Sequence, residues 1–173
     1  MNKIFQPTKK EIHSSNLFKF QNFIEIKYKK KFKTYKKLWE WTNQYPEQFW
    51  TSIVEFFDVS IKKNNNLKVY KLSPQFWRTK FFDKCKINYY ELISRNNSTN
   101  LAIQFIGENG YQENISYKEL NLKVNSLSNY FKSLNICSGD VIVGYLPNIP
   151  DTIISFLAAS KIGAVWSSCS SDF

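Results

Sequence analysis

Nucleophilic chemistry is limited in this chain by its histidine and cysteine content. A Ser–His or Cys–His couple needs an imidazole beside the nucleophile, and the sequence holds one histidine, His13, in a polar segment near its start. Cys85, Cys137 and Cys169 are widely spaced and form no C-x-x-C pair, so neither a disulfide framework nor a zinc site is indicated. We expect three reduced, mostly buried thiols, and no catalytic or metal-binding residue.

Hydroxyl groups cluster near the C-terminal end, in the stretch SSCSS (167–171). Phosphate-binding loops combine serine or threonine with glycine, because glycine lets the backbone amides fold around the phosphate. This cluster contains no glycine. Taken alone, it indicates a polar strand end rather than a phosphate loop.

The elements that would position this cluster are a strand, a helix and a second strand, predicted over residues 140–168. The run DVIVGYL has the composition of a parallel strand that is buried on both faces. Pro147 and Pro150 mark the turn into an apolar helix, and Gly163 is suited to its left-handed cap. A unit of this kind pairs its strands in parallel with a right-handed crossover. Pro147, Asn148 and residues 166–169 then fall at the carboxyl ends of the strands, where open α/β sheets bind ligands.

The edge of such a sheet would leave amide groups and an apolar face without partners. We therefore expect this chain to be the front part of a longer protein, and to aggregate or bind hydrophobic dyes when it is produced alone.

The residues before this unit predict a mainly helical region. Two capping boxes, Thr8–Glu11 and Ser116–Glu119, each predict a helix start, and Pro46 is expected to separate two further helices. The first helix is expected to run on through residue 23. After an Asn-rich bridge near residues 61–69, where we place a loose boundary, we expect extended pieces at 67–72 and 76–82, a helix at 87–94 and a hairpin that turns at Asn109–Gly110.

Apolar residues at helical spacing predict which faces are buried. The stripe of the helix after Pro46 consists of Phe49, Trp50, Ile53, Val54, Phe56 and Phe57. The stripe of the helix after Ser116 consists of Leu120, Val124, Leu127, Phe131 and Leu134.

Charge is distributed unevenly along the chain. The formal net charge is +10, and residues 1–80 hold 17 Lys and Arg against 6 Asp and Glu. Only Arg78 and Arg95 are arginines, whereas surfaces that grip phosphates or read bases favour the bidentate arginine fork. A composition rich in Lys, Asn and Ile explains most of this excess without a ligand. The run KYKKKFKTYKK (27–37) could still make a weak anionic contact.

Neither a membrane span nor a secretory signal is evident. No apolar run reaches the roughly 18 residues that a spanning helix needs, and the first residues lack the apolar stretch of a signal peptide. We expect a soluble, cytoplasmic protein.

The segment 139–173 resembles the first strand–helix–strand of the adenylate-forming acyl-CoA synthetases, and among them the acetoacetyl-CoA synthetase group. That group typically reads G-D-x-V-x-G-Y-L-P-N, then A-A-x-x-x-G-A-x-W-S-S and S-P-D-F-G. The matching positions are Gly139, Asp140, Gly144, Tyr145, Leu146, Pro147, Asn148, Gly163, Ala164, Trp166, Ser167, Ser168, Asp172 and Phe173.

Upstream segments are similar to the same family. Residues 35–59 resemble the segment that precedes the nucleotide-binding region of acetyl- and acetoacetyl-CoA synthetases, and residues 115–131 fit the helix before the first sheet strand. The stretch 81–93 resembles W-F-P-G-A-x-L-N-Y-A-E-N-L, but it keeps only Phe82, Asn88, Tyr89 and Glu91, and Asp83 and Lys84 replace the proline and glycine. In the C-terminal segment, Ser171 replaces the proline of S-P-D-F-G. These departures concern local turns.

The resemblance implies an α/β fold with two parts: a mainly helical N-terminal extension, residues 1–95, and the incomplete start of an AMP-binding domain, residues 96–173. It implies a ligase that uses acetoacetate, MgATP and coenzyme A, and that passes through an acyl-adenylate. The family's phosphate loop, its adenine and ribose motifs and its catalytic lysine have no counterpart here, so the chain alone is expected to be inactive. By resemblance, the residues that border the acyl or pantetheine channel are Pro147, Asn148, Trp166, Ser167, Ser168 and Cys169.

Three alternatives remain open. The chain could belong to another short-chain acyl-CoA synthetase such as acetyl-CoA synthetase, because few specificity residues are present. It could be a binding or regulatory module that kept the front of a synthetase. A Lys-rich RNA-binding protein fits least, because interleaved aromatic and arginine residues are lacking. For the channel residues, the plain alternative is that Trp166 packs in the core and the serines end a strand.

Overall fold

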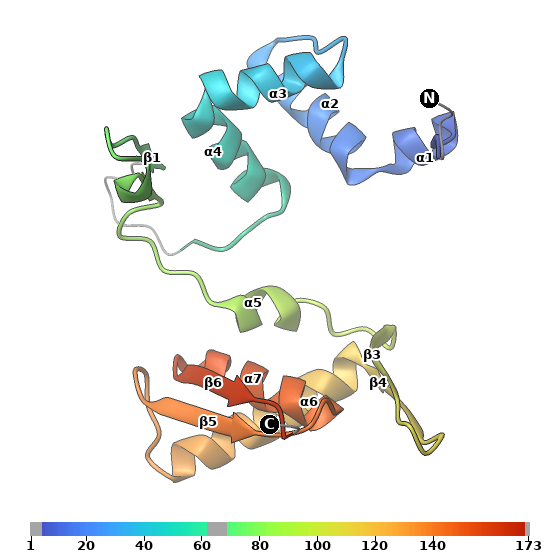
Figure 1. Ribbon diagram of the computed structural model, residues 1–173, viewed down its shortest axis with the longest axis vertical. Coiled ribbons are helices and arrows are strands. Elements are labelled where there is room, and N and C mark those ends of the chain that lie inside the picture. The colour runs from blue at the N-terminus through green and yellow to red at the C-terminus, as the bar shows by residue number, and fades with distance from the viewer. Residues whose placement is uncertain (1–4, 62–68, 172–173) are drawn as a thin grey trace. The chain divides into compact units, whose positions relative to one another are not determined.

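The computed structural model describes residues 5–61 and 69–171, and the chain divides between Lys86 and Ile87 into two compact units (Figure 1). The Asn-rich bridge of residues 62–68 lies outside the described residues, so the expected start of a strand at residue 67 does as well. The division into residues 1–95 and 96–173 stays a prediction.

The first unit begins with two short helices instead of the single predicted one. Helix α1 (Lys9–Ser14) starts at the predicted capping box, and α2 (Asn16–Tyr28) follows it directly. Ser15 separates them, because its extended backbone ends α1 while its side chain accepts a hydrogen bond from the Phe18 N–H and starts α2. A serine that caps in both directions interrupts a continuous helical pattern.

Helices α3 (Tyr35–Gln44) and α4 (Pro46–Phe56) confirm the predicted break at Pro46, which occupies the first turn of α4. The core of this unit is aromatic. Its buried residues are Phe20, Ile24, Leu38 and Trp41. From the predicted stripe of α4, Phe49, Ile53 and Phe56 pack against this core, whereas Phe57 at the end of the helix is exposed.

The rest of the first unit is a small antiparallel pair, β1 (Tyr70–Lys71) with β2 (Lys80–Phe81). A single 3₁₀ turn, Phe76–Arg78, replaces part of the second extended piece that the sequence predicts.

The second unit starts with α5 (Tyr89–Ser94), within the predicted helical range, and a hairpin of β3 (Leu101–Ile106) and β4 (Gln112–Ser116). The loop between these strands has five residues, and only Gly110 has a positive φ, of 81°. The hairpin turns at Asn109–Gly110 as predicted, but a tight turn with positive φ at both residues, which this pair of residues would favour, does not form. Asn109 instead accepts a hydrogen bond from the Tyr111 N–H through its side chain.

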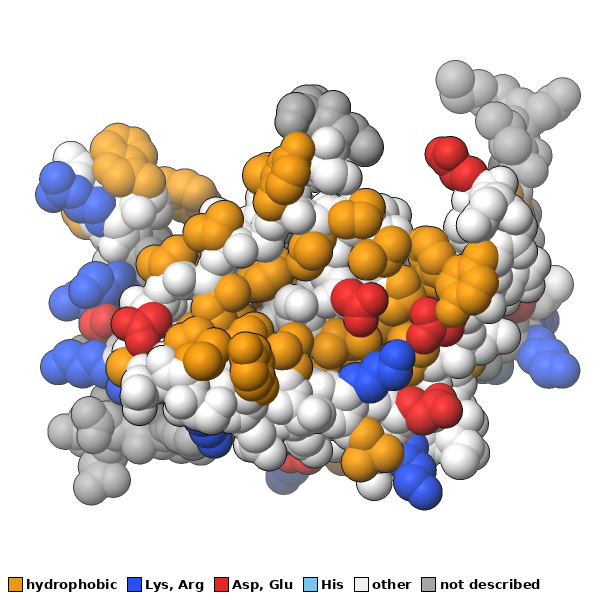
Figure 2. Space-filling model, turned by 90° about the horizontal axis from the view of Figure 1, so that it is seen from below, with side chains coloured by type: hydrophobic (Ala, Val, Ile, Leu, Met, Phe, Trp, Pro, Cys, Tyr) orange, Lys and Arg blue, Asp and Glu red, His pale blue; other side chains and the backbone are white. Residues whose placement is uncertain are grey.

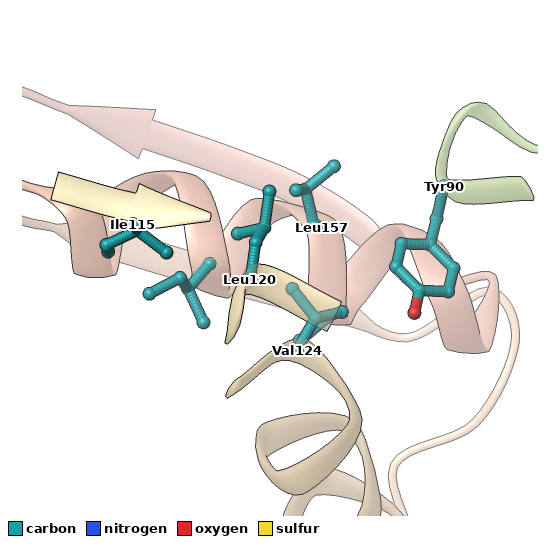
Figure 3. Packing of buried hydrophobic residues seen from close by; sticks show 7 residues of the cluster. Tyr90, Ile115, Leu120, Val124 and Leu157 are labelled. Atoms are coloured by element: carbon teal, nitrogen blue, oxygen red, sulfur yellow. The ribbon is translucent and has the colours of Figure 1, made fainter. Parts of the chain in front are cut away.

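Helix α6 (Tyr117–Ser133) starts at the second capping box, as predicted. Its Leu120 and Val124 are buried, and they meet Ile115 of β4 and Leu157 of α7 (Pro150–Ile162) in the core of this unit (Figure 3). Leu127 and Phe131 pack at the edge of the core. Leu134, the last residue of the predicted stripe, lies just beyond the helix and is exposed.

The predicted strand–helix–strand unit is confirmed. β5 (Val141–Tyr145) pairs in parallel with β6 (Val165–Cys169), with α7 between them in sequence and α6 packed on α7 (Figure 1). Gly163 caps α7 with a φ of 78°. Pro150 occupies the first position of α7, and Pro147 lies in the turn before it.

The indole of Trp166 on β6 lies next to Gly144 on β5. A Cβ on Gly144 would lie 2.5 Å from Cη2 of Trp166, so the indole occupies the space that any larger residue would need. Trp166 lies on the face that α7 covers, because it lines one hollow together with Phe156 and Ser160 of α7.

The opposite face of the β5–β6 pair is uncovered. Val141, Val143, Tyr145 and Val165 are each more than half exposed. The expectation that this strand is buried on both faces was therefore wrong for the described residues, since α7 covers one face and no described element covers the other. Exposed hydrophobic side chains are frequent on the side of the molecule drawn in Figure 2. No helix in residues 5–61 or 69–171 is both long and apolar enough to cross a membrane.

The capping box of α6 gives a prediction for stability. Ser116 Oγ accepts a hydrogen bond from the Glu119 N–H, and the Glu119 carboxylate accepts from the Ser116 N–H at 2.8 Å. We expect Ser116→Ala to lower the free energy of unfolding by about 1 kcal/mol in urea titrations. Ser133→Ala, in the exposed last turn of α6, serves as the control and is expected to change it by less than about 0.5 kcal/mol.

The same box makes stability depend on pH. The hydrogen bonds from the backbone and side chain of Ser116 hold the pKa of Glu119 below its ordinary value. This contribution is present above the unfolded pKa and is lost as the pH falls through the lowered folded pKa. The stability difference between the parent and Ser116→Ala should therefore shrink in acid, and a difference that grows in acid would contradict the assignment.

The contact between Gly144 and Trp166 gives a second prediction. Gly144→Ala forces the added Cβ against the indole, and we expect a loss of about 1–3 kcal/mol in unfolding free energy. Trp166→Phe removes the part of the indole that the added Cβ would meet. The loss of unfolding free energy in the double variant Gly144→Ala with Trp166→Phe should therefore be smaller than the sum of the losses in the two single variants. Strict additivity would show that the two positions are not coupled.

The uncovered sheet face gives a third prediction. The chain produced alone should self-associate and bind a hydrophobic dye, and Val141→Glu with Val143→Glu should reduce both effects. Leu122→Glu, at an exposed position of α6 outside this sheet face, is the control and should change neither the self-association nor the dye binding. A cooperative melt of a monomer that does not depend on concentration would contradict this expectation.

Candidate functional site

The carboxyl ends of β5 and β6 lie side by side. Tyr145 is paired with Cys169, the last residue of β6, and Gly144 is paired with Ser168. Pro147 and Asn148 follow β5 in the turn that leads into α7, and both are exposed. Polar groups from two segments of the chain are thus available at this end of the sheet.

Hydrogen bonds hold the loops that border this end. The Tyr145 hydroxyl donates to the Ser171 carbonyl at 3.2 Å, which brings the residues after β6 next to the end of β5. The Pro147 carbonyl accepts from the Thr152 hydroxyl at 2.7 Å and from the Ile149 N–H at 2.9 Å. Asn148 therefore lies in a turn that these two bonds to the Pro147 carbonyl hold.

Of the six residues expected at a channel, Pro147 and Asn148 lie in the turn after β5, and the other four lie on β6. Alternation along β6 puts Ser167 and Cys169 on the uncovered face and Trp166 and Ser168 on the face toward α7. Trp166 is paired with Ile142, near the start of β5, so its backbone lies away from the carboxyl end. Pro147, Asn148, Ser168 and Cys169 lie closest to that end.

Trp166 borders a separate open hollow of about 410 Å³. Its lining includes Ile87, Asn88 and Tyr89 before and in α5, and Phe156 and Ser160 of α7. Trp166 is half-buried. This exposure does not decide between the two alternatives that the sequence left open, a residue that borders a channel and a residue that packs in the core.

Asn88 fixes this hollow. Its amide donates to the Ser160 carbonyl at 2.8 Å, and its side-chain oxygen accepts from the Ser160 hydroxyl and from the Tyr90 N–H. Sequence reasoning noted Asn88 only as a family match and missed this role, because the bond to Ser160 spans 72 residues and leaves no local signal.

Two ionisable groups with shifted pKa values lie close together before β5. Asp140 accepts from the Cys137 N–H at 2.7 Å, and this bond holds the pKa of Asp140 below its ordinary value. The neighbouring carboxylate raises the pKa of the Cys137 thiol in turn. Both groups lie before β5, at its amino end, so they take no part in a site at the carboxyl end.

The remaining candidates for chemistry are dispersed. His13 stacks near Phe18 in the first unit, with 4.6 Å between ring centroids. Cys85 is half-buried and Cys137 and Cys169 are exposed, so the expectation of mostly buried thiols was wrong, although all three are free. In the described ranges, no group of three or more His, Cys, Asp or Glu side chains is placed to hold a metal ion.

The described residues at this end of the sheet offer hydrogen-bonding groups but no acid–base pair. Asn148, Ser167 and Ser168 supply amide and hydroxyl groups. Such groups suit hydrogen bonds to a polar ligand at a strand end.

Comparisons with known proteins concern the sequence and the fold of the chain. Residues 94–173 match the sequence model of the AMP-binding enzyme family. The acetoacetyl-coenzyme A synthetase of Rhizobium meliloti is 26% identical over 170 residues, which make up 98% of this chain and 26% of that protein. The acetyl-coenzyme A synthetase of Methanothrix thermoacetophila is 30% identical over 161 residues, 91% of this chain and 24% of that protein.

A solved structure gives the same result for the fold. The acetoacetyl-CoA synthetase from Streptomyces lividans superposes with a TM-score of 0.83 at 27% identity, over 97% of this chain and 26% of that one. This chain thus spans about a quarter of the length of the relatives that it matches. The comparisons confirm that the chain resembles the adenylate-forming acyl-CoA synthetases, acetoacetyl-CoA synthetases among them.

Proposed function

We propose that this chain is the N-terminal region of a cytoplasmic, ATP-dependent acetoacetate–CoA ligase. In the first step a carboxylate oxygen of acetoacetate bonds to the α-phosphorus of MgATP, the bond to the β-phosphate oxygen breaks, and pyrophosphate leaves. In the second step the thiolate of coenzyme A bonds to the carbonyl carbon of acetoacetyl-AMP, and AMP leaves with the bonding electrons. The products are acetoacetyl-CoA, AMP and pyrophosphate.

The observation that carries this proposal is the likeness to the acetoacetyl-CoA synthetase from Streptomyces lividans, which extends over 97% of this chain at a TM-score of 0.83. Because it includes both units, it supports a helical extension of residues 1–95 followed by the start of an AMP-binding domain at residues 96–173.

The part of this chain in the reaction is to bind and shape the site. In the proposal, Pro147, Asn148, Ser167, Ser168 and Cys169 border the acyl or pantetheine channel at the carboxyl ends of β5 and β6. Trp166 supports the same strand from the side of α7. No described residue is assigned to proton transfer, and Mg²⁺ enters bound to ATP as part of the substrate.

Acetyl-CoA synthetase is the second candidate. Two relatives of that name, from Methanothrix thermoacetophila and Bdellovibrio bacteriovorus, are 30% and 31% identical to this chain, whereas the acetoacetyl-CoA synthetases of Rhizobium meliloti and Caenorhabditis elegans are 26% and 28% identical. Identity at this level does not separate two acids that differ by one acetyl unit. A regulatory module without chemistry is the third reading.

The experiment is a pyrophosphate–ATP exchange assay on the native polypeptide, isolated from its source cells with an antibody raised against this segment. We expect exchange that depends on acetoacetate and is at least about tenfold slower with acetate at equal concentration. The apparent mass of the captured polypeptide is determined on the same sample.

Each outcome separates the candidates. Faster exchange with acetate than with acetoacetate would identify acetate as the substrate and favour acetyl-CoA synthetase, with the same two-step reaction. A polypeptide of 20.5 kDa without exchange would contradict the ligase and favour the regulatory module.

A further inference from the structure

A wide, shallow hollow of about 680 Å³ lies in the first unit, where the loop between α2 and α3 meets the side of α3. Four lysines and one glutamate line it, so its lining carries a clear positive excess. The full lining is Lys30, Lys31, Phe32, Lys33, Thr34, Lys37, Glu40, Trp41, Gln44 and Tyr45.

The loop that carries the lysines is held in one shape. The carboxylate of Glu25 accepts the Phe32 N–H at 2.8 Å, and the Gln21 amide donates to the Phe32 carbonyl at 3.0 Å. The ring of Phe32 packs on Trp41, with 5.6 Å between centroids. Lys31 and Lys33, on either side of Phe32, are exposed. The positive charges are therefore presented by a preorganised segment.

Two of the ammonium groups lie at the wall of the hollow. Lys30 Nζ is 4.1 Å from the ring centroid of Tyr45, and Lys37 Nζ is 2.9 Å from a carboxylate oxygen of Glu40. Glu40 is the one acidic residue in the lining, and it neutralises one lysine at most. Charges of one sign that converge on a hollow raise the local concentration of anions.

The start of α3 and one donor without an acceptor lie next to these charges. Thr34 caps the ten-residue helix α3 through the Lys37 N–H, so the start of this helix faces the same loop. Trp41 lines the hollow with 4% of its surface exposed, and its indole N–H is buried without an acceptor in the described part of the chain. Buried donors of this kind are rare in folded proteins.

We propose that the hollow between the α2–α3 loop and α3 binds a soluble anion that carries several phosphate groups. Lysines serve phosphates as point charges, and several of them match a ligand of more than one phosphate better than a single carboxylate. The inference stands on this geometry and does not depend on the ligase proposal. Bare lysine-rich composition, the alternative, predicts no preference of the anion for this hollow over other lysines.

Residue-resolved acetylation of the whole chain tests the proposal, with inorganic tripolyphosphate as the probe and mass spectrometry as the readout. Bound tripolyphosphate should slow the labelling of Lys30, Lys31 and Lys33 by about fivefold or more. Lys9 and Lys10, exposed in α1 and outside the hollow, should label at an unchanged rate. Raising the salt concentration should weaken the protection.

Paired variants with the same change of charge supply the control. In the variant with Lys31→Gln and Lys33→Gln, about ten times more tripolyphosphate should be needed to protect Lys30 to the same degree. Lys9→Gln with Lys10→Gln should leave that protection as it is. Both pairs lie at exposed positions, so neither is expected to affect folding.

Three results would overturn the proposal. These are equal protection of all lysines, no protection at all, and protection by vesicles of phosphatidylcholine and phosphatidylserine without protection by tripolyphosphate. The last result would identify the lysines as a contact to an anionic membrane surface instead of a site for a soluble ligand.

Discussion

The candidate site depends on the parallel pairing of β5 with β6 over α7. This pairing puts Tyr145 next to Cys169, and so brings the turn at Pro147–Asn148 to the residues that end β6. Parallel strands need a crossover element, and α7 provides it with Pro150 at its start and Gly163 at its end. The close approach of Trp166 to Gly144 explains why a residue without a side chain stands in β5.

The two units differ in how they are stabilised. The first is built from aromatic side chains on three helices, with Phe20 in edge contact with Phe49 and Phe56. The second is built from aliphatic residues on α6, α7 and β4, with Asn88 joining α5 to the last turn of α7. The residues at the carboxyl ends of β5 and β6 therefore belong to the aliphatic unit.

Local signals in the sequence predicted much of this fold. The boxes at Thr8 and Ser116, the break at Pro46 and the cap at Gly163 are confirmed, because each is decided by side chains within a few residues. The break at Ser15 was missed for a physical reason: a serine can continue a polar helical stretch or cap it, and the choice depends on tertiary packing.

Features set by distant partners were beyond prediction. The apolar run of β5 indicates two covered faces, but one sequence does not say what covers each of them. The same holds for Asn88, whose partner Ser160 lies far along the chain, and for the hydrogen bond from Tyr145 to Ser171. The roles expected of Trp166, Ser167, Ser168, Cys169, Pro147 and Asn148 came from resemblance and stay predictions.

The most direct measurement for the central claim is a crystal structure of the native polypeptide with a non-hydrolysable acyl-adenylate analogue and coenzyme A. The account predicts ligand atoms in contact with residues at the carboxyl ends of β5 and β6, including Asn148 or Ser168. Ligands bound elsewhere, with these ends enclosed by protein and out of contact, would contradict it.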